Sequence, residues 1–220
     1  MMKIFAIIPV KKFENGKTRL SPLLSADDRI HLSGLMLDDT LSALAEAKSL
    51  QYDNIVVVSG DRRAEEIASR RGARFLREDR ETGVNSAVEL AERYCTSQGA
   101  DATVVIPQDL PLLDPYDIDM ACNMAENEQH CIVICPSLRY DGTNLLLRKP
   151  PAAIKTCYDN DSYEAHIKSA NRSGMPVKLY FSKRLMVDID TPEDATQLAK
   201  EAVQGSSKTL EFIRSRIAKL

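Results

Sequence analysis

Two aspartates follow apolar runs that have the composition of buried strands. Asp109 ends the stretch VVIPQD (104–109), and Asp190 follows LMVDI (185–189), which also contains Asp188. Mg²⁺ is a hard cation that proteins often hold with one or two carboxylates together with substrate phosphates. Each acid alone could equally be a turn or capping residue. Together, Asp109 and Asp190 predict one magnesium site between two strand ends.

A cluster of cations follows the first apolar run, IFAIIPV (4–10). Lys11, Lys12, Lys17 and Arg19 fall within nine residues of a chain whose net charge is −3. Ammonium and guanidinium groups can hold a triphosphate by charge and by forked hydrogen bonds. A solvated basic loop is the alternative, and we favour phosphate binding.

The same loop imitates a P-loop without completing one. Gly16, Lys17 and Thr18 match the end of the GxxxxGK[ST] pattern, but Lys11 stands where the first glycine is needed. Pro22 also follows too soon for a long helix directly after Lys17. The spacing therefore disfavours a P-loop NTPase.

Three further polar segments could contact small ligands. In DGTN (141–144), a turn precedes an exposed Thr143 hydroxyl, and in DSYEAH (161–166), Ser162 begins a helix whose amides suit an anion. In ETGVNSA (81–87), Gly83 permits close backbone approach and Asn85 offers both a donor and an acceptor. A hairpin turn and two helix caps would explain these segments as well. His166 is the one histidine near such a segment.

The elements that must position these residues alternate between strands and helices. Near-continuous apolar runs predict strands buried on both faces: 4–10, 54–60, 103–109 and 131–137. Shorter strands are expected at or near a sheet edge: 144–148, 177–181 and 185–189. The order predicts one α/β domain over residues 1–220, Rossmann-like, with a mostly parallel central sheet and helices on both faces.

Helices are predicted from capping residues and apolar periodicity. Ser25 caps a long helix, and Thr191 caps another that has Pro192 at its first position. Further helices are expected over 62–71, 84–97, 115–127, 162–173, 192–204 and 206–219. The last is amphipathic, which makes a homodimer an expectation.

Composition narrows the class of protein. The chain has 220 residues, 44% of them apolar and 28% charged, which is usual for a globular domain. The slightly negative charge gives no indication of nucleic acid, and no run is long enough to span a membrane. Five cysteines without a CxxC pair favour reduced thiols and a cytoplasmic location.

These motifs together resemble the 2-phospho-L-lactate guanylyltransferase family of coenzyme F-420 biosynthesis. IPVK, KTRLSP, GVNSA, PQDLPLL, DGTNLLL, DSYEAH and DIDTPEDA occur in the family's order over nearly the whole chain. The strand-end motifs alone are shared with the wider class of nucleotidyltransferases of GT-A-like fold. The resemblance implies GTP, Mg²⁺, release of pyrophosphate and a phosphorylated acceptor such as 2-phospho-L-lactate or phosphoenolpyruvate.

The resemblance also implies roles for particular positions. It places catalysis on Lys17, Arg19 and Asp109, and the metal on Asp109 and Asp190. The acceptor acid would be bound by Thr143, Asp159 and Ser162. Relatives often carry glycine where Asp159 stands. The acidic side chain of Asp159 would repel an anionic acceptor, so only the backbone amide at this position suits it. The nucleotide would lie near a larger set: Pro9, Val10, Lys11, Lys17, Ser59, Gly60, Gly83 and Asn85.

The implied reaction needs little acid–base help, because a phosphomonoester is already an anionic nucleophile near neutral pH. Three alternatives stay open at this point. One is a cytidylyl- or uridylyltransferase, and one is a nucleotide sensor without catalysis. The third is a GT-A-type glycosyltransferase, in which Asp188 and Asp190 would form a DxD metal motif.

Overall fold

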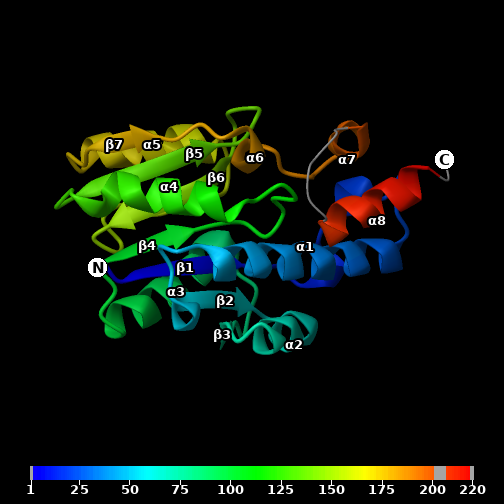
Figure 1. The fold of residues 1–220 in the computed structure, drawn as a ribbon, viewed down its shortest axis with the longest axis horizontal. Coiled ribbons are helices and arrows are strands. Elements are labelled where there is room, and N and C mark those ends of the chain that lie inside the picture. The colour runs from blue at the N-terminus through cyan, green and yellow to red at the C-terminus, as the bar shows by residue number, and fades with distance from the viewer. Residues whose placement is uncertain (1, 201–206, 219–220) are drawn as a thin grey trace.

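A seven-stranded sheet forms the centre of the computed structural model, which describes residues 2–200 and 207–218 (Figure 1). Its strand order is β3-β2-β1-β4-β6-β5-β7. The strands are β1 Ile4–Pro9, β2 Ile55–Ser59, β3 Arg74–Arg77, β4 Ala102–Val105, β5 Cys131–Pro136, β6 Thr143–Lys149 and β7 Val177–Leu179. The predicted α/β class with a mostly parallel sheet is confirmed.

The first four strands run parallel, and β6 reverses the direction. β1 pairs in parallel with β2 and β4, and β6 pairs antiparallel with both β4 and β5. The prediction that 144–148 lies at or near an edge is wrong, because β6 lies third from the β7 edge. The reversal brings Thr143, at the start of β6, to the carboxyl edge of β4.

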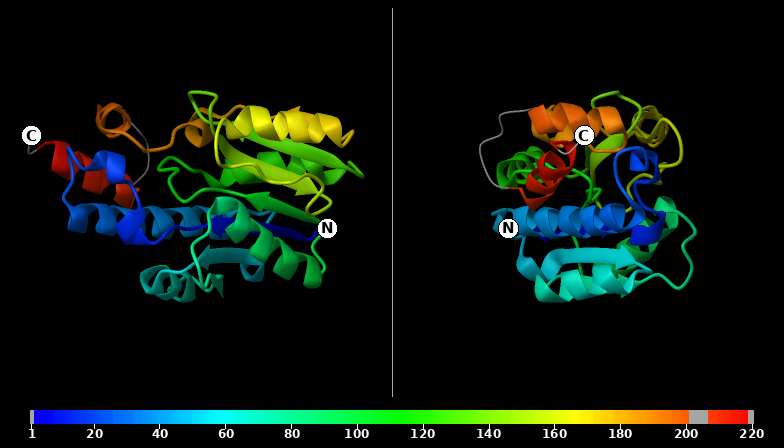
Figure 2. Two further views of the ribbon diagram at one scale, coloured as in Figure 1. Left: turned by 180° about the vertical axis from the view of Figure 1, so that it is seen from behind. Right: turned by 90° about the vertical axis from the view of Figure 1, so that its right-hand side faces the viewer.

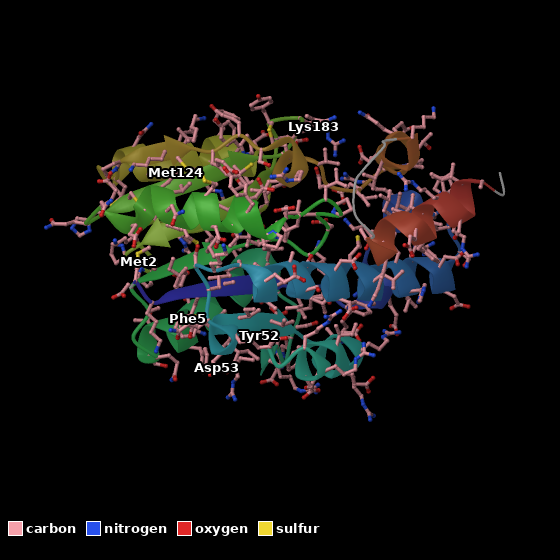
Figure 3. All side chains as sticks on the ribbon, in the orientation of Figure 1. Met2, Phe5, Tyr52, Asp53, Met124 and Lys183 are labelled. Atoms are coloured by element: carbon pink, nitrogen blue, oxygen red, sulfur yellow. The ribbon has the colours of Figure 1, made fainter. Side chains whose placement is uncertain are left out.

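Two helical layers cover the sheet, because successive side chains on a buried strand point to opposite faces. On β1, Ile4, Ala6 and Ile8 pack toward α1, α2, α4 and α6, whereas Phe5 and Ile7 pack toward α3 and α5. Figure 2 shows helices on both faces of the sheet, and Phe5 of β1 is labelled in Figure 3. The helices of these layers are α1 Ala26–Glu46, α2 Arg62–Arg70, α3 Val84–Ser97, α4 Pro115–Glu126, α5 Ser162–Arg172 and α6 Lys183–Met186.

Two short elements differ from the sequence prediction. The stretch 185–189 is not a strand: Leu185 and Met186 end α6, and Met186 accepts a backbone hydrogen bond from Leu138 at 2.8 Å. β3 was not predicted, because only two of its four residues, Phe75 and Leu76, are apolar, and this run is too short to show a strand pattern.

Helix α8 Lys208–Ile217 packs on the half of α1 that extends beyond the sheet, and α7 Pro192–Lys200 packs on α8 (Figure 1). The predicted caps are present, since Ser25 accepts from the amide of Asp28 and Thr191 accepts from that of Asp194. Predicted helical positions 201–204, 206 and 219 lie outside the described residues. Leu210 and Ile213 of α8 are buried against α1 and α7, so the apolar face behind the homodimer prediction is used within the chain.

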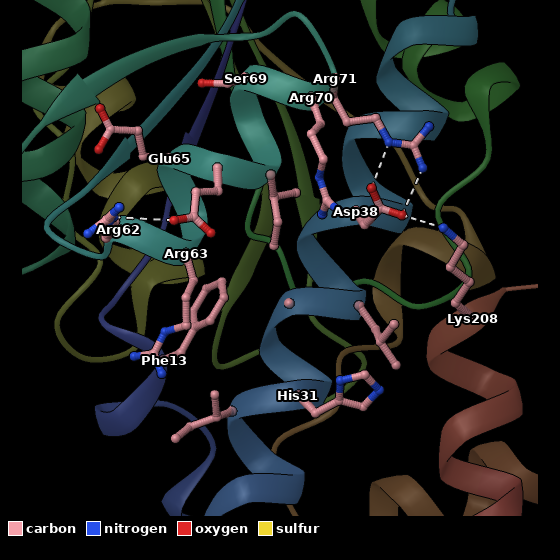
Figure 4. A pocket seen from close by; sticks show the side chains of 15 residues that line it. Phe13, His31, Asp38, Arg62, Arg63, Glu65, Ser69, Arg70, Arg71 and Lys208 are labelled. Atoms are coloured by element: carbon pink, nitrogen blue, oxygen red, sulfur yellow. Dashed lines mark hydrogen bonds and ion pairs between the residues drawn. The ribbon is translucent and has the colours of Figure 1, made fainter.

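A cavity of about 1250 Å³ lies between α1, α2 and α8 (Figure 4). Its charged groups hold the helices together. Asp38 on α1 accepts from Arg71 Nε at 2.6 Å and from Lys208 Nζ at 2.5 Å. No helix among the described residues is long and apolar enough to cross a membrane.

Candidate active site

A second cavity, of about 470 Å³, opens at the carboxyl edge of β1 and β4. This is where ligands bind in open α/β sheets. Five segments meet there: the loop after β1, the turn after β4, the start of β6, the start of α5 and residues 188–190. The predicted site residues that line it are Pro9, Lys11, Lys17, Arg19, Asp109, Thr143, Ser162 and Asp190.

Backbone hydrogen bonds hold the two acid-bearing segments side by side. The amide of Ile189 donates to the carbonyl of Asp109 at 3.3 Å, which joins residues 80 positions apart. The carboxylate of Asp194 accepts from the amides of Asp190 at 3.0 Å and Thr191 at 2.8 Å. The first turn of α7 therefore fixes the position of Asp190 without any strand there.

Lys17 lies between the two aspartates. Its Nζ donates to Asp190 Oδ1 at 2.8 Å and makes a short ion pair with Asp109, and only 7% of its side chain is exposed. Its backbone is left-handed, with a φ of 53°. Burial lowers the pKa of Lys17, but the charges and hydrogen bonds of the two carboxylates outweigh it and raise the pKa to about 12. Lys17 is the counter-ion of both acids.

Asp188 is a site residue that our interpretation of the sequence did not select. It lines the same cavity, and burial together with the charges of Asp109 and Asp190 raises its pKa to about 6. Arg139 is its distant counter-ion, with Nη2 3.9 Å from Oδ2. The signal was in the sequence, because residues i and i+2 of an extended chain face the same side.

The carboxylates fit a divalent cation that arrives with phosphates. Among residues 2–200 and 207–218, no three His, Cys, Asp or Glu side chains form a ready metal site. The ammonium group of Lys17 donates to both Asp109 and Asp190. Three clustered carboxylates, one with a raised pKa, are nevertheless a set that a hard cation relieves.

Thr143, Ser162 and the start of α5 line another part of the cavity. Thr143 and Ser162 are both buried, which contradicts the prediction of an exposed Thr143, yet both line the cavity. Ser162 begins α5, and the helix has no side-chain cap at its N-terminus. Uncapped first-turn amides favour a negatively charged ligand.

Five residues predicted near the nucleotide do not line this cavity. Val10 is buried and its amide donates to the carbonyl of Val58. Ser59 is fully buried and accepts from the amide of Asp61 at 3.0 Å. At Gly60, an added Cβ would lie 3.1 Å from a backbone oxygen. Gly83 has a φ of 113° and precedes α3.

Asn85, the fifth of these residues, holds the loop that carries Asp159. Its Nδ2 donates to Asp159 Oδ2 at 3.0 Å, and its Oδ1 accepts from the amide of Tyr158 at 2.9 Å. Asp159 lies in an adjoining hollow of about 590 Å³. This hollow shares Arg19, Ser162, Asp188 and Asp190 with the 470 Å³ cavity. In this structure, then, the side chain of Asn85 contacts protein groups.

Solved structures share this architecture. A protein from Desulfovibrio desulfuricans, named as a nucleotide-diphospho-sugar transferase, matches with a TM-score of 0.79 and 20% identity, over 99% of this chain and 96% of its own. A nucleotidyl transferase from Methanothermobacter matches with a TM-score of 0.67 and 15% identity, over 97% and 99%. These likenesses show the fold alone.

Curated relatives are closer in sequence. The chain is 34% identical to the phosphoenolpyruvate guanylyltransferase of Rubrobacter xylanophilus, over 90% of this chain and 94% of the relative. It is 34% identical to the 2-phospho-L-lactate guanylyltransferase of Methanothermobacter thermautotrophicus, over 90% and 84%. It is 31% identical to the 3-phospho-D-glycerate guanylyltransferase of Phenylobacterium zucineum, over 96% and 97%.

The family comparison covers both walls of the cavity. The model described as "Guanylyl transferase CofC like" matches residues 2–217, which include the cationic loop, the aspartates and the start of α5. The resemblance of the motifs is thereby confirmed, and the chain belongs to this family of nucleotidyltransferases.

Proposed function

We propose that this enzyme transfers the guanylyl group of GTP to a phosphorylated three-carbon acid, 2-phospho-L-lactate or phosphoenolpyruvate, in coenzyme F-420 biosynthesis. The observation that carries the proposal is the meeting of a cationic loop, three carboxylates, two hydroxyl side chains and the start of α5 in one cavity. The names of the relatives support guanylyl transfer and an acid of this size.

On the nucleotide side, cations and carboxylates divide the work. Lys11 and Arg19 reach the cavity from the loop after β1, where they would bind the triphosphate. Asp109 and Asp190, with Asp188 beside them, would hold Mg²⁺, which supplies charge stabilisation for the departing pyrophosphate. Lys17, once released from the two carboxylates, is the third cation available to the phosphates.

On the acceptor side, the protein only has to bind and orient. The phosphate oxygen of the acid is an anionic nucleophile near neutral pH, so no general base is required. It attacks the α-phosphorus of GTP, a new P–O bond forms, and the bond to pyrophosphate breaks. The main barrier is the repulsion between two anions, which Thr143, Ser162 and the amides of α5 offset by positioning the acid.

The decisive experiment measures pyrophosphate release for each of the four nucleoside triphosphates with 2-phospho-L-lactate, phosphoenolpyruvate and 3-phospho-D-glycerate. We expect GTP to be preferred by at least tenfold, with one or more of these acids as acceptor. Equal or better turnover of CTP or UTP would refute the guanylyl assignment. Binding of GTP without pyrophosphate release would indicate a sensor, and turnover of a nucleotide sugar would indicate a glycosyltransferase.

The proposal extends to a cytoplasmic location and a homodimeric assembly. All five cysteines are unpaired thiols in the structure, which is typical of a reducing, cytoplasmic compartment. The homodimer stays a prediction that sedimentation or light scattering of the purified enzyme tests directly.

A further inference from the structure

A buried histidine lies directly behind the proposed acceptor wall. His166 on α5 is fully buried, one helical turn after Ser162, so both side chains lie on the same face of the helix. Its ring packs edge-on against Tyr158, with centroids 4.8 Å apart. The ring does not line the cavity beside Thr143 and Ser162, yet both of its nitrogens are engaged.

The protonation of this ring follows from its partners. The amide of Cys157 points its N–H at Nε2 at 2.9 Å, and an amide N–H can only donate. Nε2 must therefore be the acceptor, which leaves the proton of the neutral ring on Nδ1. Burial and the charge of Arg148 lower the pKa of His166 to about 4, which agrees with a neutral ring.

The tautomer determines what Thr143 can do. Nδ1 lies 3.0 Å from Thr143 Oγ1, so the ring donates to this hydroxyl. Thr143 and Ser162 share one further hydrogen bond, at 3.3 Å. The two hydroxyl groups have two protons, and one of these forms the hydrogen bond between Ser162 and Thr143. The other has no acceptor among the described residues, so it is left for the cavity that both side chains line.

We propose that His166 is a positioning residue that holds the Thr143–Ser162 hydroxyl pair as a hydrogen-bond donor toward the anionic acceptor acid. This inference rests on the proposed function for the identity of the ligand. A ring with the proton on Nε2 would instead accept from Thr143 and turn that proton away from the acid. The wall would then present oxygen lone pairs to an anion, which repel it.

Two substitutions test the hydrogen bonds of the two ring nitrogens one at a time. The amide of Asn reaches about as far as Nδ1, and that of Gln about as far as Nε2. His166→Asn therefore keeps the donor to Thr143, and His166→Gln keeps the acceptor for the Cys157 amide but loses that donor. A hydrogen bond to a charged group contributes about 1.5–3 kcal/mol.

We expect His166→Gln to raise the KM for phosphoenolpyruvate about 10- to 100-fold while the KM for GTP changes less than about twofold. His166→Asn should stay within about threefold of wild type for both substrates. On a Thr143→Val background, His166→Gln should add less than about twofold, because the histidine acts through that hydroxyl. Equal losses in both variants, additive effects, or a matching rise in the KM for GTP would overturn the proposal.

Two further measurements do not depend on turnover. Titration calorimetry with phosphoenolpyruvate should show weaker binding to His166→Gln than to wild type and His166→Asn, and equal binding by all three would overturn the proposal. Nitrogen-15 NMR of the ring, assigned by its absence in His166→Asn, should show the Nδ1–H form at pH 7, and an Nε2–H form would overturn it. An enzyme that passes both measurements but releases no pyrophosphate would refute the proposed function alone.

Discussion

Replacing Lys17 with methionine removes the ammonium group between Asp109 and Asp190 while keeping a side chain of similar length. The pKa of Lys17 rises from 10.5 to about 12 in the fold. Each pKa unit corresponds to about 1.4 kcal/mol, so the carboxylates stabilise the charged lysine by about 2 kcal/mol net of burial. Because the pKa is raised, this contribution is complete below pH 10.5 and is lost as the pH rises through about 12.

The substitution also leaves Asp109 and Asp190 without their shared cation. Removing one partner of a buried ion pair typically destabilises by about 3–5 kcal/mol. Because 38% of the Asp190 side chain is exposed, solvent screens part of this effect. We expect Lys17→Met to lower the free energy of unfolding by about 2–4 kcal/mol at pH 7.5, measured by urea titration without divalent cations. Lys12→Met, an exposed lysine of the same loop, is the matched control and should change it by less than about 0.5 kcal/mol.

Adding millimolar Mg²⁺ then tests whether the cation and the Lys17 ammonium group compete for the same carboxylates. A ligand that binds only the folded state stabilises it by mass action. We expect Mg²⁺ to restore much of the lost stability in Lys17→Met and to stabilise wild type less, because in wild type the cation must displace the ammonium group. Equal unfolding free energies of Lys17→Met and wild type would refute the counter-ion role. Equal stabilisation of the two proteins by Mg²⁺ would refute competition for one site.

Three further substitutions test other parts of the site and its frame. Asp188→Asn should make the metal-free enzyme about 3 kcal/mol more stable at pH 7.5. The pKa of Asp188 is about 6 in the fold against 3.8 in the unfolded chain, so wild type loses stability as the pH rises from 3.8 through 6. The unfolding free energies from urea titrations at about pH 4.5 and 7.5 should differ less for the variant than for wild type, and parallel pH profiles would contradict this. Asp109→Ala should lower kcat/KM about 100-fold or more in pyrophosphate release with an intact circular dichroism spectrum, and near-normal Mg²⁺-dependent turnover would remove its metal role. Glu92→Gln should destabilise the fold by about 3–5 kcal/mol, because it leaves the buried Arg148 without its counter-charge; a urea midpoint equal to that of wild type would show that the pair contributes nothing.

The long, strongly patterned elements could be predicted from the sequence, whereas among the short elements β7 was predicted and β3 and α6 were not. The apolar run of β1 and the Ser25 cap of α1 are local signals that need no partner to be recognised. Residues 185–189 have strand composition, but burial of Leu185 and the turn of α6 decide their conformation. The place of β6 depends on pairing with β4 and β5, which no local pattern encodes.

The chemistry of the site was predictable by residue type, and its internal contacts were not. Asp109 and three of the four cations of the first loop, Lys11, Lys17 and Arg19, meet in one cavity as expected for residues that follow strand ends at one edge, and Asp190 joins them although no strand directly precedes it. The ion pairs of Lys17 depend on which opposite charges come into reach in three dimensions. The same holds for Asn85, whose contacts with the 158–159 loop need an element that lies 73 residues further along the chain.

The contact between Lys17 and Asp190 spans 173 positions of the chain, and the ion pairs of the site are incomplete until it forms. Contacts between distant parts of a chain are slow to form, since loop closure precedes any gain from them. The acid site is thus completed only when residues near 190 have docked beside Asp109 and Lys17. We therefore expect bound nucleotide to lengthen the lifetime of the native enzyme by slowing unfolding, with little effect on the rate at which the chain folds.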